Sequence, residues 1–389
     1  MHDIVIIGAG PAGSMAAERL AARGLDVVVL EEHEEIGAPV HCTGLLGEEA
    51  FAEFDLPASL IFARASAASF WTASGQSIRI DSDRVRAAII DRGELDRHLA
   101  ERAASAGASV RVGQRVARVA VHSDGVSVTG AGGEVRARIC VLACGANYRF
   151  HRTLGLGLPA AHLLSAQLEI GFPAAPDIEV RLGRDVAPEG FAWMVPFERA
   201  GMARARIGLM SKSSAGPRFE RFASALASRA GVSAPAQAPR LKMLPLGPVP
   251  RTYADRVVAI GDAAGLVKPT TGGGIYYGLL SGTIAADVIG RALETGQTDA
   301  SALRAYELGW RSRLGSEIQA GLRFRRIASG MSDASMDALV TLARVDGVVP
   351  LLKEHASFNW HRKAAMALLG HPAFRQIAFK SWARSVRPF

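Results

Sequence analysis

The stretch Asp3-Ile-Val-Ile-Ile-Gly8-Ala-Gly10-Pro11-Ala12-Gly13 decides the fold of this chain. Its β-branched run at 4–7 is typical of a buried parallel strand. The three glycines follow with G-x-G-x-x-G spacing. The first permits a tight turn, the second lets the backbone approach a pyrophosphate, and the third lets helix and strand pack closely. A glycine turn between a strand and a helix predicts a dinucleotide-binding unit.

The residues after the glycines complete this unit. An Ala-rich helical segment runs over 15–23, Gly24 ends it, and 27–30 is a second apolar strand that closes on Glu31. The N-terminus of the helix offers unpaired N–H groups and a positive dipole end to a phosphate. A carboxylate at Glu31 can accept both hydroxyls of an adenosine ribose and would repel a phosphate there. The sequence therefore disfavours NADP at this site.

Length and composition bound the class of protein. A chain of 389 residues can hold two or three domains or subdomains. The N-terminus enters the first strand without a basic region, so we expect no signal peptide. Cys42, Cys140 and Cys144 are too few for a disulfide framework and have no zinc-like partners. The longest charge-free stretch, 269–286, contains a proline and three consecutive glycines, which argues against a membrane span. We expect a cytoplasmic protein.

The formal net charge of +8 is unevenly placed. No acidic residue follows Glu354, whereas six basic ones do: Arg362, Lys363, Arg375, Lys380, Arg384 and Arg387. One interpretation is a solvated basic tail. The other is peripheral contact with an anionic membrane, because apolar residues interleave with the basic ones as in interfacial segments: Phe374, Ile377, Phe379 and Trp382. No nucleic-acid-reading motif accompanies the charge.

The middle of the chain has mainly the pattern of strands. Residues 60–80 alternate like strands of a second sheet, 91–107 has the pattern of a helix closed by glycine, and 135–143 is an apolar strand. Three short runs with an Asp124-Gly125 hairpin turn predict an antiparallel meander: 110–112, 116–121 and 126–128. From 163 to 244 the period is again that of strands, broken by a helix near 219–229.

A second motif returns the chain to the first unit. Residues 257–260 form another buried strand, which leads into Gly261-Asp262-Ala-Ala-Gly-Leu-Val-Lys-Pro269-Thr-Thr-Gly272-Gly273-Gly274-Ile275 and a long helix over 274–293. An aspartate at the end of such a strand can receive a ribityl hydroxyl or bridge to a pyrophosphate. The N-terminus of the helix would face the pyrimidine edge of a flavin and stabilise negative charge on the reduced ring. The two motifs together predict FAD.

These motifs resemble the geranylgeranyl reductase family of FAD-dependent oxidoreductases, which shares the p-hydroxybenzoate hydroxylase fold. The segment 261–277 is close to the family's version of the second motif. Gly190-Phe191-Ala-Trp193-Met-Val-Pro196 is similar to its aromatic-x-Trp-x-Phe-Pro signature, with Val195 where Phe is usual. Pro39-Val-His-Cys42-Thr-Gly44 is similar to its Pro-Val-x-Cys-x-Gly loop beside the flavin, and Asp91-Arg92 matches its arginine that reaches the cofactor.

The resemblance implies an α/β fold with three parts. We expect a Rossmann-like FAD-binding domain assembled from 1–55, 85–160 and 245–298, an inserted antiparallel β-sheet substrate domain from 56–84 and 161–244, and a helical C-terminal region over 299–389. The motifs and the resemblance together assign these residues to the cofactor: Gly8, Gly10, Pro11, Ala12, Gly13, Glu31, Glu32, Cys42, Gly44, Arg92, Val116, Gly145, Asp262, Gly272, Gly273, Gly274 and Ile275.

One departure from the family concerns flavin reduction. The family group usually has Ala-Asp-Gly after the strand at 135–143, whereas this chain has Ala143-Cys144-Gly145. The acid that would contact a ribose or a pyridine nucleotide is therefore absent. A second G-x-G-x-x-G unit is also absent, since Gly130-Ala-Gly-Gly133 falls in a predicted hairpin turn. We expect transient NAD(P)H or a ferredoxin-like donor to deliver the electrons.

Two residues are the candidates for catalysis, Cys42 and Tyr276. By the resemblance, Cys42 lies beside the flavin and supplies a proton to the alkene, whereas the plain alternative is a small residue that packs under its loop. His41 and one of the two tyrosines, Tyr276 or Tyr277, are weaker candidates for the same proton. Trp193, with Phe191 and Pro196, is expected to form a wall of the substrate pocket rather than simple core.

The resemblance implies reduction of carbon–carbon double bonds in a polyprenyl lipid or diphosphate. The first alternative is an FAD-dependent aromatic monooxygenase of the same fold. A flavin-dependent halogenase is disfavoured, because its N-terminal lysine is missing: no lysine occurs before Lys212. The non-enzymatic alternative is a flavin-bearing electron carrier or a prenyl-lipid-binding protein. The prenyl substrate, the number of bonds reduced and the oligomeric state stay open.

Overall fold

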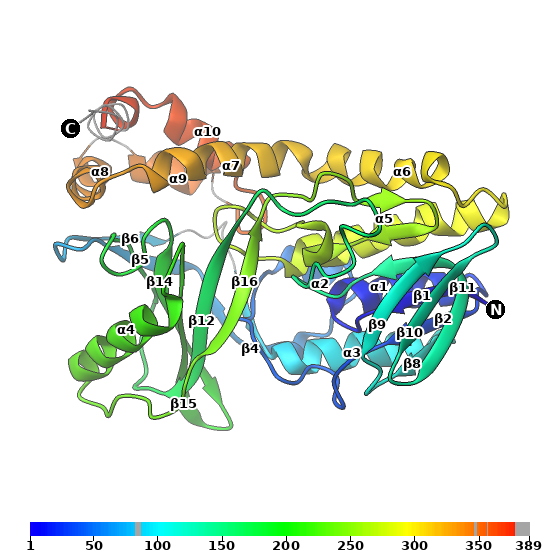
Figure 1. The fold of residues 1–389 in the computed structure, drawn as a ribbon. Coiled ribbons are helices and arrows are strands. Elements are labelled where there is room, and N and C mark those ends of the chain that lie inside the picture. The colour runs from blue at the N-terminus through cyan, green and yellow to red at the C-terminus, as the bar shows by residue number, and fades with distance from the viewer. Residues whose placement is uncertain (82–86, 346–347, 356, 378–389) are drawn as a thin grey trace. The chain divides into compact units, whose positions relative to one another are not determined.

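The computed structural model describes residues 1–81, 87–345, 348–355 and 357–377, and it divides into two compact units (Figure 1). Unit 1 comprises 1–40, 92–161 and 245–318, and unit 2 comprises 41–91, 162–244 and 319–389. Each unit is thus assembled from three separate segments of the chain. The three-part domain division expected from the sequence stays a prediction.

Unit 1 is built on a parallel sheet whose strands come from all three of its segments. The strand order is β17-β18-β11-β1-β2-β8. The parallel strands are β1 (His2–Ile7), β2 (Val27–Leu30), β8 (Ser109–Arg111), β11 (Gly133–Leu142) and β18 (Val257–Ala259), and β17 (Tyr253–Ala254) pairs antiparallel with β18. Ile4 to Ile6 and Val27 to Val29 are almost fully buried, as expected for strands covered on both faces.

The predicted meander is wrong in its first strand. Strand β8 pairs in parallel with β2 at the edge of the sheet, with Val28 opposite Ser109. Only β9 (Val116–Val121) and β10 (Val126–Gly130) continue antiparallel into β11. The period-2 pattern of 110–112 is shared by both arrangements, so periodicity alone did not separate a crossover from a hairpin. The turn predicted at 130–133 is confirmed as the β10–β11 hairpin.

Helices α1 (Pro11–Ala21) and α3 (Arg92–Ser105) pack on this sheet, and α5 (Ile275–Glu294) packs along α1 (Figure 1). All three were predicted, each within a few residues of its observed bounds. Helix α5 approaches α1 very closely, because a Cβ at Gly282 would lie 2.5 Å from the carbonyl oxygen of Ala12. Gly278, one turn earlier, also faces Ala12. These two glycines let the helix backbones meet, so the two motifs are joined through one tight helix contact.

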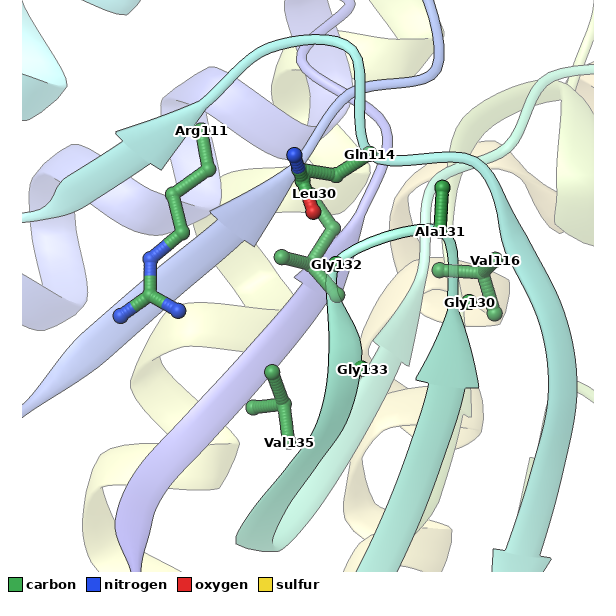
Figure 2. A pocket seen from close by; sticks show the side chains of 9 residues that line it. All are labelled: Leu30, Arg111, Gln114, Val116, Gly130, Ala131, Gly132, Gly133 and Val135. Carbon is green, nitrogen blue, oxygen red and sulfur yellow. The ribbon is translucent and has the colours of Figure 1, made fainter.

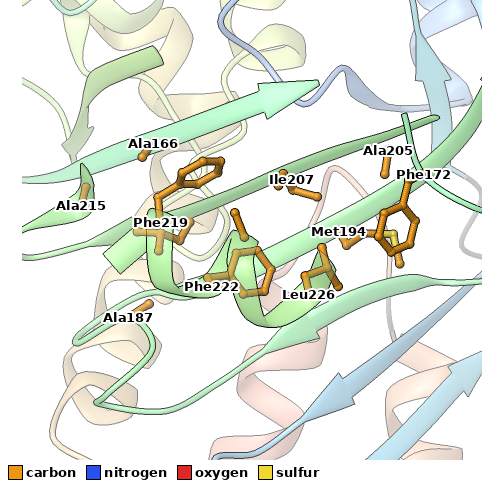
Figure 3. Packing of buried hydrophobic residues seen from close by; sticks show 13 residues of the cluster. Ala166, Phe172, Ala187, Met194, Ala205, Ile207, Ala215, Phe219, Phe222 and Leu226 are labelled. Carbon is orange, nitrogen blue, oxygen red and sulfur yellow. The ribbon is translucent and has the colours of Figure 1, made fainter. Parts of the chain in front are cut away.

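Unit 2 is built on a seven-stranded sheet with the order β16-β12-β15-β14-β13-β5-β6. Its strands are β5 (Ala67–Trp71), β6 (Ser77–Asp81), β12 (Ala161–Gly171), β13 (Ile178–Arg181), β14 (Phe191–Arg199), β15 (Met202–Ser211) and β16 (Arg240–Leu246). Helix α4 (Ala215–Ala230) covers one face, where Phe219, Phe222 and Leu226 pack on Met194 and Ile207 (Figure 3). This is the apolar core of the unit.

The opposite face of the same sheet carries aromatic and charged side chains. A small sheet of β3 (Leu45–Gly47), β7 (Ala87–Ile90) and β4 (Ile61–Ala65) contributes to a second apolar cluster with Val195 and Phe197 on this face. Phe62 stacks on Phe197 with ring centroids 5.3 Å apart. The strands expected over 60–80 are confirmed, but they divide between two sheets. Short helices α2 (Glu49–Glu53) and η1 (Ala58–Leu60) connect β3 to β4.

The C-terminal part is helical, as predicted. It contains α6 (Ala300–Trp310), a π-helical stretch η3 (Arg311–Gly315), α7 (Ser316–Ser329), α8 (Asp333–Val345), α9 (Val348–His355) and α10 (Arg362–Gly370). Phe374 is 4% exposed and stacks on Phe324, so this aromatic residue belongs to the core. Phe379, Lys380, Trp382, Arg384 and Arg387 lie outside the described residues. Within the described part of the chain, no helix has the length and apolar character to cross a membrane.

Candidate active site

The glycine turn of unit 1 has the geometry that its spacing predicts. Gly8 has a φ of +106°, and a Cβ there would lie 2.5 Å from the carbonyl oxygen of Ala143. A Cβ at Gly13 would lie 2.1 Å from the carbonyl oxygen of Gly8, so only glycine allows α1 to pack this close to the turn. Gly10 differs, because a Cβ there would meet no atom within 4 Å. Gly10 therefore leaves open space before the N-terminus of α1, where Pro11 is the first helical residue.

Glu31 links the glycine turn to the end of β2. One carboxylate oxygen accepts a hydrogen bond from the backbone N–H of Ala9 at 2.8 Å, and the other accepts one from the N–H of His33. Nδ1 of His33 lies 2.5 Å from the oxygen that accepts the His33 N–H, so the oxygen bonded to Ala9 is the one that keeps a second lone pair for a ligand hydroxyl. The same side chain thus fixes the turn and presents an acceptor beside it. Glu32 is exposed and forms an ion pair with Arg115.

Asp262 and the three glycines before α5 form a second loop of unit 1. Gly261 and Gly272 have φ values of +58° and +72°. A Cβ at Gly274 would lie 2.6 Å from Oδ1 of Asp262, so this carboxylate sits against the N-terminus of α5. The N-cap residue of α5 is Gly274, which has no side chain to cap the helix, and Ile275 is the first helical residue. Two helix N-termini with glycine at the cap therefore belong to one compact unit.

The segment 148–151, which no sequence motif predicts, supports the loop that contains Asp262. The Tyr148 hydroxyl donates to the carbonyl oxygen of Asp262 at 2.8 Å, and Nε2 of His151 lies 2.7 Å from the carbonyl oxygen of Ala263. The Arg149 guanidinium donates to the carbonyl oxygen of Val116. Burial lowers the pKa of His151, so the ring is neutral and Nε2–H is the donor. No sequence pattern marks these residues, because each acts on a backbone carbonyl distant in the chain.

The departure at Cys144 has a clear physical consequence. Burial raises the pKa of this thiol to about 11, and the S–H donates to the carbonyl oxygen of Asn147 at 3.2 Å. A neutral thiol cannot replace a carboxylate as an acceptor for ribose hydroxyls. Gly145, with a φ of +62°, leaves open space beside it.

A small pocket lies at the end of β2 in unit 1. It has a cavity volume of about 20 Å³, and Val116, assigned to the cofactor from the sequence, is one of its walls (Figure 2). Leu30, Gln114 and the 130–133 hairpin form others. This volume lies below the roughly 300–1,000 Å³ usual for ligand pockets, so the pocket by itself does not hold a whole dinucleotide.

Unit 2 carries the loop with Cys42. The thiol is half-buried, and its sulfur accepts a hydrogen bond from the N–H of Gly44 at 3.3 Å. The Thr43 hydroxyl donates to Oε1 of Gln167 at 2.8 Å. Nε2 of His41 lies 2.9 Å from the carbonyl oxygen of Arg240, and burial, aided by Lys242, lowers the pKa of His41. A neutral His41 that donates to this carbonyl is an anchor of the loop.

Trp193 lies on the same sheet face as Gln167. In β14–β15–β12 pairing, Trp193 is opposite Gly208, and Gly208 is opposite Gln167. A Cβ at Gly208 would lie 2.4 Å from the Trp193 ring, so the indole lies over this glycine. Phe191 shares the face and meets Trp193 edge-on, with ring centroids 5.8 Å apart. The sheet thus brings the tryptophan signature and the Cys42 loop, 150 residues apart in the chain, onto one face.

The remaining predicted site residues do not share the surroundings of Trp193 and Cys42. Pro196 falls on the face opposite Trp193, because successive residues of a strand alternate and Ala192 and Met194 face α4. Tyr276 and Tyr277 are 3% and 2% exposed and pack edge-on against each other. Burial raises the pKa of Tyr277 above its ordinary value. Arg92, the first residue of α3, forms an ion pair with Asp96.

The residues of unit 1 fit FAD. Two helix N-termini with glycine at the N-cap, open space at Gly10 and a fixed carboxylate at Glu31 are what a dinucleotide requires. A neutral Cys144 offers no charge that would oppose the pyrophosphate. The roles of the individual residues toward the cofactor stay predictions.

Comparison with known proteins identifies the family. The FAD binding domain family matches residues 1–313. Digeranylgeranylglycerophospholipid reductase 2 of Methanothermobacter thermautotrophicus is 35% identical over 364 residues, which cover 87% of this chain and 91% of that protein. The reductase of the same name from Methanopyrus kandleri is 32% identical and covers 90% of this chain and 92% of that protein.

A solved structure shows the same fold. The crystal structure of a geranylgeranyl bacteriochlorophyll reductase-like protein from Thermoplasma acidophilum superposes with a TM-score of 0.82 at 24% identity. The match covers 98% of this chain and 99% of that protein. The chain therefore belongs to the FAD binding domain family and, within it, to the geranylgeranyl reductase family of FAD-dependent oxidoreductases.

Proposed function

We propose that this protein is an FAD-dependent reductase that saturates carbon–carbon double bonds of a geranylgeranyl-type lipid. The observation that carries the proposal is the match, over 87% of the chain, to a protein named for the reduction of digeranylgeranylglycerophospholipid. The geometry supports it in both units. Unit 1 has a cradle that fits FAD, and unit 2 presents an aromatic sheet face next to a thiol-bearing loop.

The chemistry divides between cofactor and chain. Bound FAD, once reduced, supplies a hydride to one alkene carbon, and the other carbon requires a proton. We assign that proton to the Cys42 thiol, whose sulfur is oriented by the Gly44 N–H. In unit 1, the two glycine loops and Glu31 hold the cofactor. We propose the buried Tyr276 as the second candidate for the proton donor, and the Tyr276→Phe variant tests it.

The aromatic face of unit 2 suits an apolar substrate. Phe191 and Trp193 form a wall for the isoprenoid chain. Burial of twenty isoprenoid carbons is worth roughly 15 kcal/mol at about 0.8 kcal/mol per carbon. A bilayer offers the same chain nearly as much, so the enzyme gains little by extracting it fully. We therefore propose that it works at a membrane surface, as a peripheral protein.

Two features bear on the identity of the electron donor: the hairpin at Gly130 to Gly133 and the thiol at Cys144. Among the described residues, no second glycine turn between strand and helix offers a site for NAD(P)H, since Gly130 to Gly133 form a hairpin. Cys144 also removes the acid that could contact a pyridine nucleotide. We propose a ferredoxin-like carrier, with transient NAD(P)H as the alternative. Anaerobic reduction of the purified flavoprotein by each donor, followed at the flavin absorbance, distinguishes them.

The test of the function is an anaerobic single turnover. The flavoprotein is reduced with dithionite, and digeranylgeranylglycerophospholipid in vesicles is added. We expect the flavin to reoxidise and the lipid to gain one or more pairs of hydrogens by mass spectrometry. If the flavin stays reduced with every prenyl substrate and reoxidises only in oxygen, the protein is not this reductase and the monooxygenase alternative replaces it.

A further inference from the structure

We infer that Arg206, together with Gln167, is a positioning residue for the loop 41–44, which holds Cys42 in its working place on the sheet. The inference rests on the proposed role of Cys42. Both residues project from the face of the seven-stranded sheet opposite α4. Neither belongs to a motif that the sequence marks.

Arg206 reaches the loop from the middle of the sheet. It is only 2% exposed, although it carries a full charge. One guanidinium nitrogen, Nη1, donates to the carbonyl oxygens of both Thr43 and Ile90, each at 2.8 Å. The same nitrogen therefore ties the residue after Cys42 to the end of β7. Two carbonyls are held by one planar donor group whose direction is fixed.

Gly44 shows how closely the guanidinium approaches the loop. A Cβ at this position would lie 2.3 Å from Nη1 of Arg206 and 2.7 Å from the carbonyl oxygen of Ile90. Gly44 also has a φ of +70°. Its N–H is the donor to the Cys42 sulfur. The residue that orients the thiol is thus itself seated against Arg206.

The surroundings of Arg206 keep it in one orientation. Its Nε donates to Glu169 at 3.2 Å, directly across from it in the β12–β15 pairing. Its guanidinium carbon lies 4.7 Å from the centroid of the Phe197 ring. Arg199 and Arg204 donate to the same Glu169 carboxylate, so the acid stays paired by other guanidinium groups. A charge buried among an acid and an aromatic ring has little freedom to move.

Gln167 holds the loop from the neighbouring strand. Its Oε1 accepts the Thr43 hydroxyl, and Gln167 is 7% exposed. Arg206 therefore binds the backbone of Thr43 and Gln167 binds its side chain. Two independent anchors on one sheet face fix one residue of the loop.

The test compares Arg206→Lys with Arg204→Lys. Both variants keep the positive charge beside Glu169, but only the first removes the two bonds to carbonyls. Folding is checked by thermal melting and FAD content. The position of the loop is measured by the rate of Cys42 alkylation with iodoacetamide, located by peptide mass spectrometry. Cys140 and Cys144 serve as internal standards, since burial raises the pKa of both thiols.

We expect Arg206→Lys to change the Cys42 alkylation rate at least fivefold and to lower kcat by roughly ten- to a hundredfold, with KM nearly unchanged. Arg204→Lys should leave both within twofold of wild type. If Arg206→Lys does not fold, Gln167→Met provides the second test, because it removes an uncharged anchor of the same loop. It should alter alkylation and kcat in the same direction.

The outcomes separate the inference from the proposed function. If folded, flavin-containing Arg206→Lys and Gln167→Met alkylate at Cys42 and turn over as wild type does, the inference is overturned. If alkylation changes but kcat does not, the two residues do position the loop, and it is the role of Cys42 in the reaction that fails. A fall in both supports the inference and the proposed role together.

Discussion

The proposed cofactor cradle of unit 1 and the proposed substrate face of unit 2 are built from different materials. In unit 1, the cofactor cradle consists of backbone: glycines at the turn, helix N-termini and carbonyls held by Tyr148 and His151. In unit 2, the substrate face consists of side chains, with Trp193 over Gly208 and a loop pinned by buried polar groups. A backbone site tolerates almost no added atom, whereas a side-chain site can be altered one group at a time. Substitutions of the glycines in unit 1 should therefore act as all-or-none, whereas substitutions of side chains in unit 2 should act as graded.

The largest effect is expected from substitutions in the glycine turn of unit 1, where one glycine should control folding and another cofactor binding. Gly13→Ala places a methyl group on the Gly8 carbonyl, so we expect a loss of more than about 3 kcal/mol in the free energy of unfolding and little soluble flavoprotein. Gly10→Ala meets no neighbouring atom, so the chain should fold but lose FAD. Thermal melting and flavin absorbance measure the two properties. Yellow, stable Gly10→Ala protein would show that the pyrophosphate does not lie there.

The next largest effect is expected at Cys42, the proposed donor of the proton to the alkene. Cys42→Ser should lower kcat by about a hundredfold, the lower end of what a positioned acid contributes, with FAD content unchanged. The control is Cys140→Ala, which replaces a fully buried thiol in β11. Single-turnover reoxidation of the reduced flavin is the measurement. Equal rates for Cys42→Ser and wild type would leave Cys42 as a packing residue.

A smaller, graded effect is expected on the aromatic face. Trp193→Ala should weaken binding of the prenyl chain by about 1.5–3 kcal/mol, seen as a raised KM. Trp71 provides the matched control, because it lies in the same sheet on the other face: its neighbour Phe70 pairs with Val180, which pairs with Trp193. If Trp71→Ala raises KM as much as Trp193→Ala does, the assignment of the substrate face is wrong.

The smallest effect is a pH dependence in unit 1. The pKa of His151 is lowered in the folded state by burial, so the unfolded state takes up a proton first as the pH falls through about 6.5. The contribution of neutral His151 to stability is therefore present above that pH and lost below it. His151→Gln can still donate to Ala263 and does not titrate. The Tm of the His151→Gln variant should fall less than that of wild type between pH 7.5 and 5.5. Parallel curves of Tm against pH for the two proteins would contradict this.

The contrast between the units also explains what the sequence could predict. The β1–α1–β2 unit and the loop before α5 follow from glycine spacing and apolar runs, because local backbone requirements leave a local pattern. Three other features do not follow from a local pattern: the crossover to β8, the α1–α5 contact through Gly278 and the hydrogen bonding of Arg206 to the Cys42 loop. They depend on which distant segments become neighbours. Pro196 illustrates the same limit, since a motif lists residues together that strand alternation places on opposite faces.

The assembly of unit 1 from three segments has a consequence for how the protein acquires its flavin. Strand β18 begins at residue 257 of 389, so during synthesis the end of β11 at Cys140–Leu142 lacks its β18 partner until most of the chain has emerged. Helix α5, which carries the second cap, follows only after that. The cradle cannot exist on a nascent chain that ends before residue 275. Flavin loading is thus a late event in biogenesis, and an open strand edge must be protected from aggregation until then.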